Sequence, residues 1–108
     1  MTIKIFYRPE MSAATASFSP SSDKPRQFVE FVKDMPVEVM SFEPAEIEDF
    51  YLAHDKDFVD GIMAGEIANG FGNKDPQVAQ TLRYTTGSMI AAAEYAILHK
   101  DRGVCSPT

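Results

Sequence analysis

The sequence predicts one α/β domain over residues 1–108, built on a few-stranded, mostly parallel sheet with flanking helices. Three observations predict this fold. Short runs rich in branched and aromatic residues, at 3–7, 37–41 and 104–106, are typical of strands. Segments with helical spacing of apolar residues separate these runs, and strands that alternate with helices favour a parallel sheet. A chain of 108 residues also allows only one domain with a thin core.

The first part of the chain predicts a strand, a loop and a helix. The strand covers residues 3–7, and the Ser- and Ala-rich segment 12–22 is typical of a loop. Asp23 or Ser22 can cap the following helix, and Pro25 suits its first turn because the missing N–H would have no partner there. This helix is expected to have about ten residues, with an apolar face formed by Phe28, Val29, Phe31 and Val32.

The middle of the chain predicts a second strand and two further helices. The strand over 37–41 is apolar on both faces, which indicates burial in a sheet covered by helices. The acidic residues at 43–46 suit the positive end of a helix, which is expected to end before His54. Asp55 can cap the next helix, over 56–64, in which Gly61 indicates close packing. The buried face of this helix is expected to contain Phe58, Val59, Ile62 and Met63.

The last part of the chain predicts two helices and a final strand. A short helix is expected from Pro76 to Leu82, and Thr85 or Thr86 is expected to cap a second, long helix that reaches Lys100. A strand over 104–106 follows. The predicted order is therefore β-α-β-α-α-α-α-β.

The net charge of −6 and the single cysteine exclude several classes of function. An acidic chain repels phosphate backbones, so a nucleic-acid partner is not expected. A cationic partner would be attracted, although the favoured interpretation is that the charge serves to keep the chain soluble. Cys105 alone allows neither an intrachain disulfide nor a cysteine-based zinc site. No apolar stretch approaches the ~20 residues that span a bilayer, and no signal peptide is recognisable, so we expect a cytoplasmic protein without a membrane partner.

The titratable residues do not form a recognisable catalytic pattern. His54 is interpreted as a residue of a helix junction, and His99 as a residue that suits the negative end of a helix. Asp55, Asp57 and Asp60 lack the regular spacing of a calcium loop and are interpreted as a solvated face. We therefore predict no catalytic residue and no metal ligand.

The most specific short motif is Asn-Gly-Phe-Gly-Asn at residues 69–73. Its two glycines can adopt positive φ, which is typical of a tight connection between helices. On this interpretation Phe71 packs into the core. The motif is not a phosphate loop, because no strand leads into it and no Lys-Ser or Lys-Thr follows.

Three segments in this order carry a resemblance to a known family: HDKDFVDG at 54–61, NGFGNKDPQVAQTLRYTTGSMIAAAEYAILHK at 69–100, and GVCSPT at 103–108. The chain resembles the N-terminal part of the histone deacetylase and acetylpolyamine amidohydrolase family, which are zinc enzymes of the arginase–deacetylase fold. The resemblance implies a partial arginase/deacetylase-like layer, namely the first strands and helices of a larger parallel sheet.

In that family, the paired catalytic histidines and the metal ligands follow the region that this chain matches. The resemblance thus implies that this chain alone is not an enzyme and holds no cofactor, although the family uses zinc. The one part of the family's substrate channel that the chain matches is the rim. The rim residues implied by the resemblance are Asn69, Gly70, Phe71, Gly72 and Asn73.

The sequence leaves two main functions open. The first is a non-catalytic, self-associating deacetylase-like domain, whose exposed faces are covered in a homodimer or higher homo-oligomer. The second is the N-terminal half of a zinc-dependent deacetylase, which hydrolyses acetyl-lysine or acetylpolyamine amides once a C-terminal segment or chain completes it. A third function is a small-ligand binder that uses the acidic surface and the loop at 69–73.

Overall fold

The computed structural model describes residues 2–13 and 20–108. Most of the loop predicted over 12–22 therefore lies outside the described residues. Within the described part, the elements in chain order are β1 (Ile3–Phe6), η1 (Pro9–Met11), η2 (Pro20–Asp23), α1 (Lys24–Val32), β2 (Val37–Met40), α2 (Ile47–Phe50), α3 (Lys56–Met63), α4 (Pro76–Leu98) and β3 (Val104–Cys105).

The three strands form one parallel sheet, as the sequence predicts, and the structure adds the strand order β2-β1-β3. β1 is the central strand, and its Ile5 lies opposite Val39 of β2 and Cys105 of β3. Parallel neighbours need long crossover connections, and α1 connects β1 to β2, whereas the segment containing α2, α3 and α4 connects β2 to β3. The predicted α/β class is confirmed.

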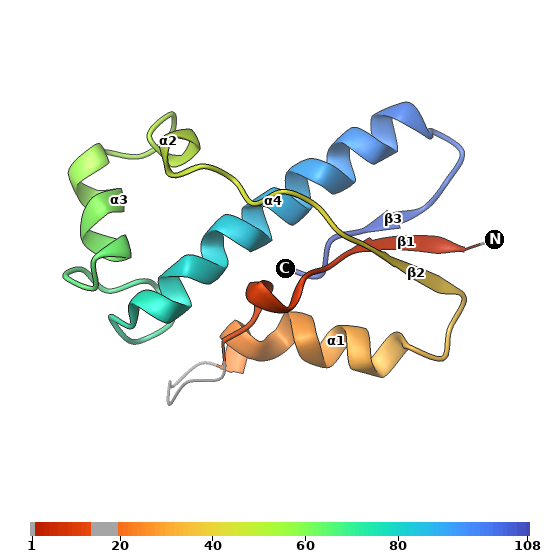
Figure 1. Ribbon diagram of the computed structural model, residues 1–108, viewed down its shortest axis with the longest axis horizontal. Helices are drawn as coiled ribbons and strands as arrows, with labels where there is room; N and C mark the ends of the chain where they lie inside the picture. The colour runs from red at the N-terminus through yellow and green to blue at the C-terminus, as the bar shows by residue number, and fades with distance from the viewer. Residues whose placement is uncertain (1, 14–19) are drawn as a thin grey trace.

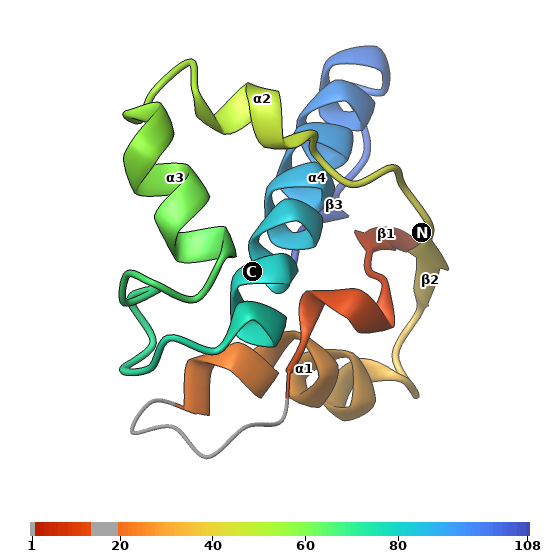
Figure 2. The ribbon, with the colours of Figure 1, turned by 60° about the vertical axis from the view of Figure 1, so that its left-hand side comes forward.

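Helices α1 and α4 lie on opposite sides of the sheet (Figures 1 and 2). Successive side chains of a strand point to opposite faces, so neighbouring residues of β1 serve different layers. Phe6 packs in a cluster with Met11, Phe42 and Ala92, and its ring centroid lies 5.8 Å from that of Tyr95 on α4. The main apolar cluster thus lies between α4 and the sheet.

Helix α4 is one continuous helix of 23 residues, so the prediction of two helices separated near Thr85 is wrong. The hydroxyl groups of Thr81 and Thr85 donate to the carbonyl oxygens of Val78 and Leu82, at 2.7 and 3.3 Å. Because the threonine side chains bond back within the helix, they do not compete for a new N-terminus. The helix also ends at Leu98 rather than Lys100.

The predictions for the other helices are confirmed in part. α3 begins as predicted, with the Asp55 carboxylate accepting from the backbone N–H groups of Asp57 and Phe58. The helix expected after residue 43 is reduced to the single turn of α2, because residues 43–45 are extended instead. Asp23 does not cap α1 with its side chain, which bonds to Arg26 and Gln27.

The extended segment 43–45 crosses α4 at very short range. The backbone N–H of Ala45 donates to the carbonyl oxygen of Arg83 at 2.9 Å, and the Nε of Arg83 donates to the carbonyl oxygen of Ala45 at 2.9 Å. Gly87 permits this crossing, because a Cβ at this position would lie 2.5 Å from the carbonyl oxygen of Glu43. The described residues contain no helix that is both long and apolar enough to cross a membrane.

We predict that Gly87→Ala destabilises the protein by about 1–3 kcal/mol, because the new methyl group would press on backbone atoms that cannot rotate away. Urea unfolding followed by circular dichroism measures the change. Gly103→Ala is the matched control, since its Cβ would meet only the Ile3 side chain at an ordinary 3.6 Å. Equal stability of the two variants would contradict the close crossing.

Candidate functional site

The loop at residues 69–73 joins α3 to α4 and is held by a compact set of hydrogen bonds. The buried Asn69 side chain donates to the Oδ1 of Asn73 at 2.7 Å and accepts from the backbone N–H of Phe71 at 2.9 Å. Gly70 and Gly72 have φ values of 91° and 85°, as the sequence predicts. The loop is therefore a tight connection whose conformation depends on both asparagines and both glycines.

This loop also prepares the N-terminus of α4. The Oδ1 of Asn73 accepts from the backbone N–H of Asp75 at 2.9 Å, and the Asp75 carboxylate accepts from the backbone N–H of Gln77 at 2.8 Å. Phe71 is only half-buried, so the expectation that it packs into the core is wrong. The role of the loop as a substrate rim stays a prediction, and most of its polar groups are used within the loop.

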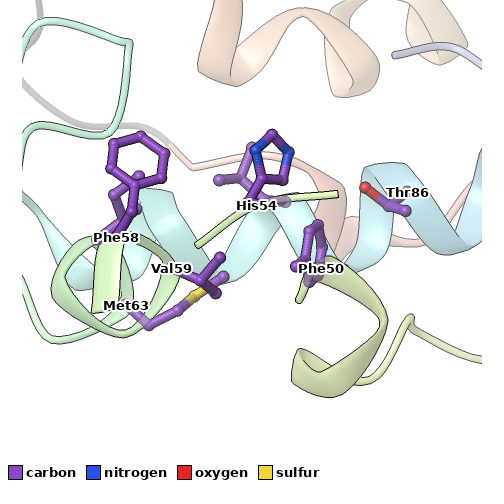
Figure 3. A pocket seen from close by; sticks show the side chains of 8 residues that line it. Phe50, His54, Phe58, Val59, Met63 and Thr86 are labelled. Atoms are coloured by element: carbon purple, nitrogen blue, oxygen red, sulfur yellow. The ribbon is translucent and has the colours of Figure 1, made fainter. Parts of the chain in front are cut away.

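A second feature is an apolar pocket of about 190 Å³ where α2 and α3 pack against α4 (Figure 3). The sequence patterns did not reveal it, because it depends on how three separate helices meet. Its walls are mainly apolar, with one imidazole and one hydroxyl group. The lining residues are Phe50, His54, Phe58, Val59, Ile62, Met63, Leu82 and Thr86.

His54 lies at the junction between α2 and α3, as predicted, on the exposed side of this pocket. Its backbone N–H donates to the carbonyl oxygen of Phe50 at 3.0 Å, and its ring centroid lies 6.3 Å from that of Phe58. Across the described residues, no hydrogen bond or ion pair reaches the imidazole. The contacts of His54 therefore place it at the helix junction, through its backbone bond to Phe50 and its ring contact with Phe58.

His99 follows α4 and is also engaged locally. Its Nδ1 lies 3.2 Å from the carbonyl oxygen of Tyr95, and the two rings are stacked with centroids 4.1 Å apart. Tyr95 and His99 are one helical turn apart in sequence, so both contacts stabilise the C-terminal end of α4. This geometry agrees with the interpretation of His99 as a residue of the helix terminus.

The clustered acidic residues on α3 have structural partners. The Asp60 carboxylate accepts from the Lys56 ammonium and from the Tyr51 hydroxyl, both at 2.5 Å. The hydrogen bonds from Lys56 and Tyr51 lower the pKa of Asp60, and the bond to Asp60 raises the pKa of Tyr51. Asp60 thus links α2 to α3, whereas the sequence predicted a merely solvated face.

The described residues do not fit a metal centre. In residues 2–13 and 20–108, no three His, Cys, Asp or Glu side chains gather where they could hold one ion. A zinc site in a protein needs three or four such ligands around the metal.

Arg8 closes the carboxyl end of β1, where open α/β sheets commonly bind ligands. Its guanidinium donates to the carbonyl oxygen of Phe42 at 2.9 Å, forms an ion pair with Glu10, and lies 5.0 Å from the ring centroid of Tyr84. The hydrogen bond to Glu10 raises the pKa of Arg8. Because the guanidinium is used in these contacts, Arg8 ties β1, β2 and α4 together. The sequence signal was the Arg-Pro-Glu that directly follows a strand.

The comparisons with known proteins add no family assignment. The chain matches no protein-family model, and no curated protein matches it at a significant level.

We predict that Asn69→Ala destabilises the protein by about 1–3 kcal/mol, because it leaves buried groups of the loop without hydrogen bonds. Thermal unfolding measures the effect. Lys74→Ala is the control, since Lys74 is an exposed residue of the same connection and its loss should cost less than about 0.5 kcal/mol. If Asn69→Ala were as stable as the control, the loop would not depend on the asparagine bonds.

Proposed function

We propose that this chain is a non-catalytic, deacetylase-like α/β domain that functions through self-association. The observation that carries the proposal is an uncovered apolar groove on the α1 side of the sheet. The groove has a volume of about 510 Å³ and lies between α1 and the segment that contains β3. Its lining residues are Lys24, Gln27, Phe28, Phe31, Cys105, Ser106, Pro107 and Thr108.

Phe28 and Phe31 belong to the predicted apolar face of α1, yet they are 40% and 85% exposed, whereas Val32 of the same face is buried. Val39 of β2 is also half-exposed, so the short helix α1 leaves this side of the sheet incompletely covered. Exposed aromatic side chains that gather along one groove are typical of surfaces that another chain covers. Burying these two phenylalanines would remove apolar surface from water, which contributes favourably to association.

The outer edge of β3 supports the same proposal. In the described residues, β3 pairs with β1 alone, so its other side has no neighbouring strand. Unpaired N–H and C=O groups along a strand edge are ready to bind another strand. A second copy placed against β3 can cover both this edge and the groove, in a symmetric dimer.

We predict that the purified chain is a dimer or a larger closed oligomer by size exclusion with light scattering, and that Phe31→Asp converts it to a monomer. An aspartate in the groove would have to be desolvated on association. Leu52→Asp is the matched control, because Leu52 is 87% exposed but lies at the α2–α3 junction, away from the groove. A monomeric wild-type chain, or dissociation by the control substitution alone, would refute the proposal.

A second readout is the reactivity of Cys105, which lines the groove. Burial raises the pKa of its thiol, so the reactive thiolate is already scarce at neutral pH. We predict that iodoacetamide alkylates Cys105 more slowly in the wild-type oligomer than in the Phe31→Asp monomer, because association covers the groove. Equal rates would place the interface elsewhere on the molecule.

The second candidate function is the N-terminal half of a zinc-dependent deacetylase, completed by a separate segment. The observation that favours it is the direction of the crossovers: α1 and α4 cover opposite sides of the sheet, as in sheets that continue by adding parallel strands at an edge. A further strand beside β3 and its helix would also cover the groove. By the resemblance to deacetylases, this added segment would contain the paired catalytic histidines and the metal ligands.

The test is to mix the chain with a separately produced C-terminal segment of a deacetylase that contains the paired histidines and the metal ligands. Formation of a stable heteromer with zinc-dependent hydrolysis of an acetyl-lysine or acetylpolyamine substrate would support this second function. A chain that keeps its own dimer and ignores the added segment would support the first.

A further inference from the structure

The pocket between α2, α3 and α4 lies in the most acidic part of the chain. Residues 43–60 contain seven acidic residues and one basic residue, so this segment alone has the full net charge of −6. The other residues contain nine acidic and nine basic side chains and are neutral in sum. The segment supplies α2 and the first part of α3, and therefore four of the eight residues that line the pocket.

The cations near this pocket are neutralised by partners of their own. The Lys56 ammonium is paired with Asp60, and the Arg83 guanidinium bonds to the carbonyl oxygen of Ala45 and lies 3.9 Å from the Glu46 carboxylate. Glu48 and Asp57 are exposed on the two helices that flank the pocket. The region thus presents a negative potential to an approaching molecule.

The pocket itself is suited to an apolar group. Figure 3 shows the pocket-lining side chains of Phe50, Phe58, Val59 and Met63, with the imidazole of His54 between the two phenylalanines. A volume of about 190 Å³ exceeds the ~150 Å³ cavity that holds a benzene molecule in a known protein core. Phe58, which lines the pocket, remains 46% exposed. Its exposed ring therefore extends the apolar surface to the mouth of the pocket.

We propose that this surface binds a basic peptide segment of a partner protein, which inserts one apolar side chain, such as phenylalanine or leucine, into the α2–α3–α4 pocket. The apolar anchor is recognised by the pocket, and the lysine or arginine residues around it are recognised by the acidic segment 43–60. This surface is separate from the groove at α1 and β3, so the inference does not rest on the proposed function.

The chemistry of the surface selects this occupant over others. Nucleic acids and anionic lipid surfaces are repelled by the charge of segment 43–60, because both present phosphate groups. A basic peptide satisfies both features, since its charges face the carboxylates while its anchor leaves water. The contact is expected to weaken as ionic strength rises, because the charged groups are exposed to solvent.

The experiment measures fluorescence anisotropy of a labelled peptide of alternating Lys and Ala with one central Phe, titrated with the full chain. We expect saturable binding that weakens with added salt. A peptide with Ala in place of the central Phe is expected to bind about tenfold more weakly, because its side chain no longer fills the pocket. Absence of binding, or equal affinity of the two peptides, would overturn the proposal.

Two pairs of variants separate the pocket from the charge. Thr86→Leu places a larger side chain in the pocket from α4 and should lower the affinity about tenfold while the helix content is unchanged. Ala93→Leu adds a leucine at an exposed position of α4 and should leave the affinity unchanged. If Thr86→Leu binds as tightly as the wild type, the pocket is not the anchor site and the proposal is wrong.

The second pair reverses charge. Glu48→Lys with Asp57→Lys should weaken binding and reduce its salt dependence, whereas Asp34→Lys with Glu94→Lys makes the same change outside segment 43–60 and should have a much smaller effect. Equal loss in both double variants would mean that only overall charge matters, which would overturn a localised site. If Thr86→Leu abolishes self-association instead of peptide binding, the occupant is a second copy of the chain and the peptide partner is excluded.

Discussion

The structure depends on the close approach of helix α4 to two backbone segments, namely residues 43–45 on one side and the sheet on the other. Gly87 allows segment 43–45 to cross the helix, and the adjacent Ser88 is fully buried against the sheet. The Ser88 hydroxyl donates to the carbonyl oxygen of Phe6 at 2.5 Å and lies 2.6 Å from the hydroxyl of Ser106. One pair of small residues thus fixes α4 relative to β1, to the residue after β3, and to the connection that leads to α2. Larger side chains at these positions would separate the layers.

The sheet could be predicted from local pattern, because each strand is a short apolar run of branched and aromatic residues between clear interruptions. The length of α4 could not. Thr85 and Thr86 are common at helix starts, and only the bonds made by the folded backbone decide that Thr85 bonds back to Leu82. The extent of α2 was also missed, since Gly87 and Ala45 meet across the fold and no local signal reports that crossing.

The loop at 69–73, the α2–α3–α4 pocket and the groove at α1 also differ in how far the sequence predicts them. The conformation of the loop at 69–73 could be predicted from its own residues, because glycines permit positive φ and asparagine side chains bond to neighbouring backbone groups. The pocket combines residues from α2, α3 and α4, and the groove combines α1 with the segment after β3. Such sites arise from tertiary packing. The helical spacing in the sequence identified their apolar residues, but it indicated that these residues are buried in the core. Phe31 and Phe58 are the clearest examples.

The register of the central strand also has a consequence for biosynthesis. Lys4 pairs with Glu38 on one side and with Val104 on the other, so the two halves of the sheet close over very different lengths of chain. On a ribosome, β1 and β2 can meet early, while the opposite edge of β1 waits until β3 has been synthesised and has left the exit tunnel. During that interval a strand edge with apolar neighbours is open, which is the situation in which nascent chains aggregate or recruit chaperones. Closure of β3 onto β1 is therefore the step that ends this exposure for a newly made molecule.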